Sequence, residues 1–342
     1  MPISVSMVES GSAWQPISGG PGTLCSHGDP YTFFVRQGDP ERLVVELEGG
    51  GCCFDKATCE NGADYTRSIG PVAAKRLFLD GRGGIGNHRN AESPIANWTH
   101  VYVPYCTGDA HTGNRTASYG IHHVGLVNAH RAIDWAVANV RRPKLVLTMG
   151  TSAGAVGSYV LAPRVFDRYP LAKHYHLADS YAPVFGQTGY TGGLENWGLL
   201  DAYSRHIPLD PTSIDHWHPL VNAYMLNVTA RAYPRARFSS YVSHADVIER
   251  NFYAVEGCGL DGCDWEKAMR AAFHAVDAPN FHYLIGPGAL HGAMQLGAFY
   301  TQEVKGTRLV EWVADLLEDK PLESLDCRPL CGGGGLSSED SE

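Results

Sequence analysis

The segment LTMGTSAGAVGS contains a serine, Ser152, in a Gly-x-Ser-x-Gly pattern formed with Gly150 and Gly154. The hydrophobic run 144–149 precedes the pattern, and a helix-compatible run, 155–161, follows it. A Cβ at either glycine would crowd a sharp strand-to-helix turn, and such a turn can raise a serine for nucleophilic attack on an acyl group. A serine that only caps the following helix is the alternative. The flanking strand and helix favour the nucleophile.

A serine hydroxyl needs a general base, and an acid must orient that base. In an α/β sheet with this elbow, the chain order is serine, acid, histidine, and both partners follow later strands. Asp246 comes directly after the expected strand 238–243, and His291 follows the expected strand 281–285 in a Gly- and Pro-containing loop. The sequence therefore predicts Ser152, Asp246 and His291 as nucleophile, acid and base.

Two other residues near these strands bear on the choice of Asp246 as the acid. Asp179, in HLADSYAP, also ends an expected strand, but it follows Ser152 too closely for the usual acid position. We expect Asp179 to form hydrogen bonds in the floor of the site instead. His244 lies beside Asp246 and is a structural alternative that would make this loop look catalytic by accident.

Acyl transfer also needs backbone N–H groups that face the developing oxyanion. Ala153 follows the nucleophile directly and supplies one such group in this topology. The expected strand 43–47 runs into Glu-Gly-Gly-Gly, and a glycine-rich loop after an early strand lets the backbone approach a substrate. Gly50 and Gly51 are therefore the other expected donors, and a merely flexible turn is the alternative.

These residues need a sheet that brings strand ends together. Expected strands alternate with expected helices at 119–140 and 303–317, and several strands are apolar on both faces. The strands are 43–47, 101–105, 144–149, 238–243 and 281–285. This pattern predicts an α/β protein with a mostly parallel sheet covered by helices on both faces. We expect one catalytic domain, 1–331, with an insertion at about 186–234 over the active site and a flexible acidic tail, 332–342.

Composition excludes several other classes. The 342 residues carry a formal net charge of −9, and Lys and Arg form no obvious stripe, so nucleic acid and anionic membrane surfaces are poor partners. No apolar stretch approaches the roughly 20 residues of a membrane helix. The first residues, MPISVSMVES, lack the basic and apolar regions of a signal peptide.

The nine cysteines lie mostly in local groups. Short loops of this kind suit disulfides and an oxidising compartment. A structural zinc site is the alternative, but CGLDGC and CRPLC do not form the matched pairs that such sites usually show.

The ordered set LEGGGCCFDKATC, VPYCTGDAHTGN, GTSAGAVGS, LADS, SHAD and a late His-Gly resembles the pectin acetylesterase and Notum family. The resemblance spans roughly residues 25–291 and implies an extracellular carboxylesterase of the α/β-hydrolase fold. It implies that Ser152, Asp246 and His291 are the triad and that Gly50, Gly51 and Ala153 are the oxyanion donors. It also implies the disulfide pairs Cys25–Cys106 and Cys53–Cys59, with Cys258–Cys263 and Cys327–Cys331 as further candidate pairs.

The chain departs from the family pattern at Cys52, where members usually carry an aromatic residue; this position is also our candidate for the odd cysteine. The resulting prediction is a secreted or periplasmic, monomeric serine esterase. It would act on short acetyl esters, including O-acetyl groups of polysaccharide, without a metal or cofactor. A lost ring could instead widen the acyl pocket for longer or aromatic acyl groups or polyesters. A non-catalytic carbohydrate-binding protein is the remaining alternative.

Overall fold

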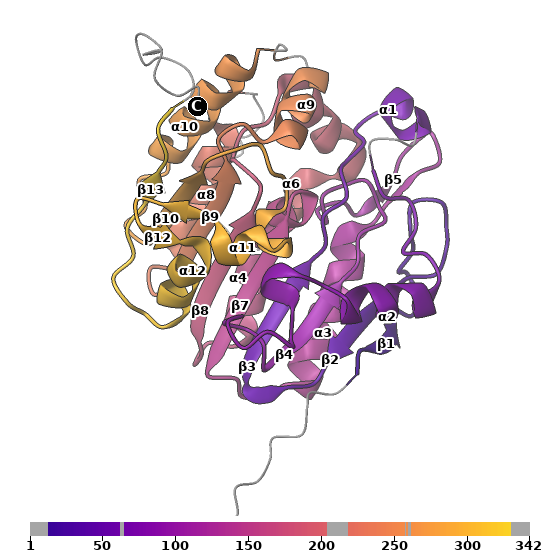
Figure 1. Cartoon of the computed structure of the whole chain (residues 1–342). Helices are drawn as coiled ribbons and strands as arrows, with labels where there is room; N and C mark the ends of the chain where they lie inside the picture. Colours follow the sequence, from indigo (N-terminus) through magenta and orange to yellow (C-terminus); the bar gives the residue numbers. More distant parts are fainter. Residues whose placement is uncertain (1–12, 62–64, 204–217, 257, 259–260, 330–342) are drawn as a thin grey trace, which may run out of the picture.

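The computed structural model describes residues 13–61, 65–203, 218–256, 258 and 261–329 (Figure 1). Within these residues, one large sheet has the strand order β1-β2-β4-β3-β7-β8-β9-β10-β13. Its strands are β1 Gln15–Ser18, β2 Thr32–Arg36, β3 Asp39–Leu47, β4 Trp98–Val103, β7 Leu145–Thr151, β8 Lys173–Asp179, β9 Arg237–Ser243, β10 Phe281–Gly286 and β13 Leu325–Asp326. Two small antiparallel pairs are formed by β5 Arg115–Thr116 with β6 His122–His123 and by β11 Glu303–Val304 with β12 Thr307–Arg308.

The sheet is parallel from β4 to β13, and β1 and β2 add an antiparallel edge. Alternate side chains of the central strands enter different apolar clusters. Val45 and Val146 pack in one cluster, whereas Val44 and Leu147 pack in another. A strand that is buried on both faces has a continuous run of apolar residues in its sequence, and the central strands of this chain have such runs. The predicted mostly parallel sheet is confirmed.

Helices cover both faces of this sheet. Side chains of α3, α4, α8 and α10 pack in the first cluster, while η1, η3, α11 and α12 contribute to the second. The helices are α1 Lys56–Asn61, α2 Val72–Asp80, α3 Gly125–Asn139, α4 Ala153–Arg168, α5 Gln187–Gly192, α6 Leu199–Tyr203, α8 Val221–Ala232, α9 Val247–Val255, α10 Gly262–Ala275, α11 Ala298–Thr301 and α12 Leu309–Leu317. Short turns of other helix types are η1 Gly84–Gly86, η2 Gly193–Trp197 and η3 Ala293–Gln295. Among the described helices, none combines the length and the apolar character needed to span a bilayer.

Both predicted helices begin later than expected. In the first, His122–His123 pairs with β5, and the Asp109 carboxylate accepts the Gly125 N–H at 2.7 Å, so that α3 starts there. In the second, Lys305 and Gly306 both have positive φ and form the turn between β11 and β12. Tertiary contacts and turn geometry thus override the apolar spacing that suggested longer helices.

The predicted insertion includes α5, η2, α6 and α8. Residues 204–217 of it, and the predicted tail, lie outside the described residues. Asn196 and Trp197 of η2 donate hydrogen bonds to the carbonyls of Phe54 and Cys53, both at 2.9 Å. These bonds tie the segment to the loop after β3. The division into one catalytic domain with an insertion over the site stays a prediction.

Two of the four disulfide pairs inferred from the resemblance are present in the structure, Cys25–Cys106 and Cys53–Cys59. The other two pairings are wrong, because Cys258 and Cys327 are both thiols.

The two thiols lie in different surroundings. The Cys258 sulfur packs against Gly186, whereas Cys263, which is itself disulfide-bonded, lies in the capped first turn of α10. The Cys327 thiol lies 3.4 Å from His244 Nδ1, in the chain that continues β13 along β10. Cys331 lies outside the described residues.

A fully buried ion pair lies inside the fold. The Arg82 guanidinium donates two hydrogen bonds to the Glu46 carboxylate of β3, and His100 Nε2 lies 2.7 Å from the same carboxylate. Burial alone would raise the pKa of Glu46, but Arg82 and His100 bring it below its usual value. The Glu46 carboxylate is therefore charged, and Arg82 and His100 stabilise this charged form inside the protein.

Replacing Arg82 with alanine should destabilise the protein by about 3–5 kcal/mol, because it leaves the Glu46 charge buried without its main partner. Denaturant unfolding measures this loss. Lys144→Ala, which breaks an exposed pair with Glu41, is the control and should change the unfolding midpoint much less. Equal effects of the two variants would contradict the buried-pair interpretation.

Candidate active site

The residues predicted for catalysis meet at the carboxyl edge of the sheet. Neighbouring strands β3, β7, β8, β9 and β10 end there, and the loops that follow them carry Gly50, Ser152, Ser180, Asp246 and His291 in turn. Ligands collect at this edge in open parallel sheets.

Ser152 lies on a strained elbow between β7 and α4, with φ 56° and ψ −125°. Such a conformation costs a non-glycine residue about 1–3 kcal/mol and persists only where its surroundings enforce it. The surroundings here are backbone atoms. A Cβ at Gly150 would lie 2.0 Å from the Gly154 carbonyl oxygen, and one at Gly154 would lie 2.1 Å from the Leu47 carbonyl oxygen. Only glycine fits at either position.

Asp246 and His291, the predicted acid and base, form a hydrogen bond with each other. His291 Nδ1 lies 2.9 and 3.0 Å from the two Asp246 carboxylate oxygens, an arrangement in which the Nδ1–H donates. Asp246 is fully buried and caps α9, since its Oδ1 also accepts the N–H groups of Ile248 and Glu249 at 3.0 Å. The cap orients the carboxylate and leaves His291 Nε2 available to a substrate or to the serine.

Asp179, the rejected acid, binds the floor of the site as expected. Its carboxylate accepts hydrogen bonds from Thr151 Oγ1 at 3.0 Å and Ser180 Oγ at 3.1 Å. The Ser180 hydroxyl in turn accepts the Gly292 N–H at 2.7 Å. Burial raises the pKa of Asp179 to about 6. This residue therefore joins the serine elbow to the loop that carries His291.

The glycine-rich loop after β3 lies beside the elbow. Gly50 and Gly51 have φ 152° and 72°, and the Thr66 N–H donates to the Gly50 carbonyl at 2.8 Å. Ala153 is the first residue of α4. N–H groups in the first turn of a helix have no partner within the helix and point toward negative charge. The glycine loop and the first turn of α4 therefore both lie next to Ser152, and the oxyanion hole stays a prediction.

Side chains fix this loop from behind. His111 Nε2 lies 2.8 Å from the Glu48 carbonyl oxygen, and burial lowers the pKa of His111 to about 4, so that a neutral ring donates this bond. The Glu48 carboxylate accepts the Tyr105 N–H at 3.0 Å and pairs with Lys75. The loop is therefore held through both the backbone and the side chain of Glu48.

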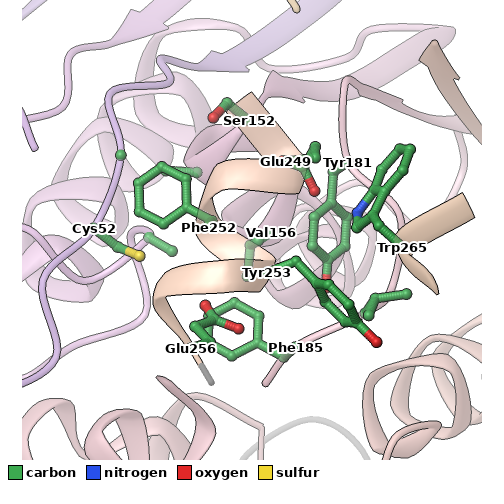
Figure 2. Close-up of a pocket in the computed structure, with 14 residues that line it drawn as sticks. Cys52, Ser152, Val156, Tyr181, Phe185, Glu249, Phe252, Tyr253, Glu256 and Trp265 are labelled. Carbon is green, nitrogen blue, oxygen red and sulfur yellow. The ribbon is translucent and has the colours of Figure 1, made fainter. Parts of the chain in front are cut away.

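Two cavities of unequal size meet at Ser152 and Gly51. The first, which we call the acyl cavity, has a volume of about 50 Å³ and lies among side chains from α4, α9, α10 and the segment after β8 (Figure 2). Its lining residues are Gly51, Cys52, Ala110, Ser152, Ala153, Val156, Tyr181, Val184, Phe185, Glu249, Phe252, Tyr253, Glu256 and Trp265. The second, which we call the trough, has a volume of about 380 Å³ and is lined by His291 together with the glycine loop, Ile248 and Leu296.

Sequence reasoning missed the side chains that shape the acyl cavity. Glu249, Phe252, Tyr253 and Glu256 lie on one face of α9 and its last turn, and Trp265 lies on α10. A signal was present, because positions i, i+3, i+4 and i+7 share a helix face and Asp246 is a good capping residue. The aromatic residues of this face keep the cavity narrow even though Cys52 stands where the family usually has a ring.

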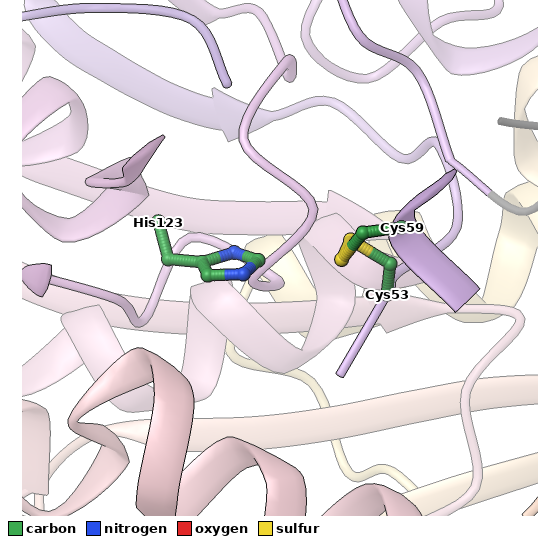
Figure 3. Close-up of side chains that lie close together, drawn as sticks. All are labelled: Cys53, Cys59 and His123. Carbon is green, nitrogen blue, oxygen red and sulfur yellow. A yellow bond between two sulfur atoms is a disulfide. The ribbon is translucent and has the colours of Figure 1, made fainter. Parts of the chain in front are cut away.

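Cys53, Cys59 and His123 form the one group with possible metal-ligand spacing among the described residues, with ligand atoms within 4.8 Å of one another (Figure 3). Both sulfur atoms are joined in the disulfide. Burial lowers the pKa of His123 to about 4, and its Nδ1 bonds the Thr107 carbonyl. As it stands, the group offers one imidazole nitrogen and a structural disulfide.

A mostly parallel sheet with a serine elbow after one strand and an acid and a histidine after later strands defines the α/β-hydrolase fold. The solved structure of the Wnt deacylase Notum from Drosophila agrees, with a TM-score of 0.67 over 94% of this chain and 98% of that chain, at 16% identity. The predicted fold class is confirmed.

Sequence comparison finds relatives of the same kind as the family that the motifs resemble. The pectinacetylesterase family model matches residues 17–181. The palmitoleoyl-protein carboxylesterase notum2 of Xenopus laevis is 30% identical over 146 residues, which are 41% of this chain and 30% of that protein. Pectin acetylesterase 11 of Arabidopsis thaliana is 25% identical over 144 residues, which are 40% of this chain and 36% of that protein. The chain is thus similar to pectin acetylesterases and to Notum carboxylesterases over about its N-terminal half, and the matches span about a third of the length of these two relatives.

The elbow geometry predicts a strong effect of a single methyl group. Gly154→Ala should destabilise the protein by about 1–3 kcal/mol or more, since the added Cβ meets backbone that cannot move aside cheaply. Chemical denaturation measures the change. Gly297→Ala is the matched control, because Gly297 has φ −58° and open space around its Cβ position. An unfolding midpoint for Gly154→Ala equal to that of the control would show that the elbow is not closely packed.

Proposed function

We propose that the protein is a secreted, monomeric serine carboxylesterase that removes short acyl groups, including O-acetyl groups, from bulky alcohols such as polysaccharides. One observation carries this proposal: an elbow serine at the junction of a narrow cavity and a wide trough, which also contains a histidine bonded to a buried aspartate. The family matches support the same class of reaction, since the relatives are named as carboxylesterases and acetylesterases.

In the proposed reaction, Ser152 Oγ attacks the ester carbonyl while His291 Nε2 takes the serine proton. Asp246 holds the ring in the required tautomer and stabilises its charged form. The N–H groups of Ala153, Gly50 and Gly51 bind the oxyanion of the tetrahedral intermediate. Collapse of the intermediate breaks the ester bond, and the leaving alkoxide takes the proton from His291. A water molecule activated by His291 then hydrolyses the acyl-enzyme, which releases the carboxylic acid and regenerates the serine.

The unequal cavities support the small acyl group and the large alcohol. Pockets that hold drug-sized ligands measure roughly 300–1,000 Å³. The acyl cavity, at about 50 Å³, lies far below that range, whereas the trough, at about 380 Å³, lies within it. The trough also has exposed apolar side chains, Ile248 and Leu296, at its edge. Nothing in these dimensions favours the longer or aromatic acyl groups of the alternative hypothesis.

The compartment is also part of the proposal. Two disulfides in the described residues are typical of proteins that mature in an oxidising environment. The mechanism uses only groups of the chain itself, and neither a metal ion nor an organic cofactor takes part in it.

Ser152→Ala should lower kcat/KM for p-nitrophenyl acetate by at least about 10³-fold, because the acyl-enzyme can no longer form. Stopped assays of nitrophenol release measure the rate. Ser158→Ala is the control: this buried hydroxyl lies six residues further on in α4 and bonds the Ala155 carbonyl and His176, away from both cavities. We expect the control to keep nearly the wild-type rate. A Ser152→Ala protein as active as the wild type would end the esterase proposal in this form.

Acyl length provides a second test. The wild type should hydrolyse p-nitrophenyl acetate at least about tenfold more efficiently than the octanoate, because the longer chain exceeds the acyl cavity and raises the barrier by about 1.4 kcal/mol or more. Phe252→Ala enlarges this cavity and should shift the ratio toward octanoate, whereas Phe78→Ala, on α2, should leave the ratio unchanged. A wild type that prefers octanoate would contradict the small-acyl proposal.

A further inference from the structure

The acyl cavity is not purely apolar. Two carboxyl groups, those of Glu249 and Glu256, line it together with the hydroxyl-bearing ring of Tyr181 (Figure 2). Both glutamates lie on the same side of the α9 segment as Phe252 and Tyr253, spaced seven residues apart. Lys, Arg and His are absent from the fourteen described residues that line the cavity. A small pocket for a plain acetyl or alkyl group has no need of these polar groups.

The backbone holds both carboxyl groups in place. Glu256 is buried, and its carboxyl group accepts the Gly186 N–H. Glu249 accepts the backbone N–H of Ala182. Burial raises the pKa of Glu256 to about 8, and burial together with the nearby Asp246 and Glu256 carboxylates raises the pKa of Glu249 well above its usual value. Near neutral pH, the Glu256 carboxyl group therefore mostly carries a proton and offers an O–H donor as well as acceptor oxygens, and the surroundings of Glu249 favour its protonated form in the same way.

Tyr181 provides an independent observation. Its side chain is 4% exposed, and its buried hydroxyl interacts with the Tyr159 hydroxyl at a geometry poorer than that of an ordinary hydrogen bond. A buried hydroxyl that lacks a good hydrogen bond loses up to about 1–3 kcal/mol. Figure 2 shows this hydroxyl directed in among the lining side chains rather than away from them. A ligand with a matching polar atom would recover that cost.

We propose that the acyl cavity selects short acyl groups that carry a hydroxyl, so that short hydroxyacyl esters are the preferred substrates of this site. The inference rests on the proposed esterase function. The acyl hydroxyl accepts a hydrogen bond from Tyr181 or a protonated glutamate and donates one to a carboxyl oxygen. An alkyl chain of the same length leaves these groups desolvated and unpaired, and sites built to bond a hydroxyl reject the analogue that lacks it.

A cationic aminoacyl group is the competing substrate, because aromatic walls and carboxylates also bind ammonium ions. The hydroxyacyl group fits better, since an ammonium ion pairs with a carboxylate and one glutamic acid would first have to lose its proton. The hydroxyl needs no change of protonation.

The experiment compares methyl butyrate, methyl 3-hydroxybutyrate and methyl β-alaninate by pH-stat titration at neutral pH. The wild type should favour 3-hydroxybutyrate over butyrate by at least about tenfold in kcat/KM, the discrimination expected from one well-placed hydrogen bond. Tyr181→Phe and Glu249→Leu should each reduce this ratio, whereas Glu249→Gln should largely keep it because the amide still donates. Tyr169→Phe is the control, since it removes another buried hydroxyl with no bond of ordinary geometry in the described residues, and it lies outside both cavities.

Each ratio is measured within one variant, so a loss of folded protein does not change it. Equal or faster hydrolysis of butyrate by the wild type overturns the hydroxyacyl inference and leaves the esterase proposal intact. Preference for β-alaninate overturns it in favour of a cation site. Failure to hydrolyse any of these esters or p-nitrophenyl acetate overturns both proposals.

Discussion

The candidate active site depends on one backbone contact, the packing of the β7–α4 elbow against the end of β3. The Cα of Gly154 lies so close to the Leu47 carbonyl that no side chain fits between them. This contact places Ser152 beside the glycine loop that leaves β3, and it forces the serine into a conformation that an isolated chain would avoid. Parallel pairing of β3 with β7 supplies the contact, since the two strands end at the same level.

Buried hydrogen bonds connect the other loops of the site to the elbow and to the glycine loop. Asp179 accepts a hydrogen bond from Thr151, the residue before Ser152, and reaches the loop of His291 through Ser180. His111 holds the glycine loop from the opposite side. Each of these hydrogen bonds lies in a buried environment, where breaking it costs more than it would at the surface. The loops around Ser152 are therefore joined by hydrogen bonds within the chain itself.

The local features of the candidate site could be predicted from the sequence, whereas the features that depend on contacts between distant segments could not. The elbow, the glycine loop and the order of Ser152, Asp246 and His291 follow from turn chemistry and from the ends of apolar strands. The pocket-lining face of α9 was missed because its spacing is also that of an ordinary core helix. The pairing of Cys258 with Cys263 is wrong, because closeness in sequence alone does not supply the separation and the Cβ directions that a disulfide needs. Both helices begin later than predicted, α3 because of a contact with a residue distant in sequence and α12 because a turn with positive φ precedes it.

One helix, α9, connects two properties that enzymes usually control separately. Its cap is the carboxylate that orients the histidine, and its next turns form a wall of the cavity for the acyl group. In the proposed mechanism, a shift of this wall would also shift the Asp246 carboxylate that holds His291. Natural variants that change acyl preference through α9 should therefore change turnover at the same time.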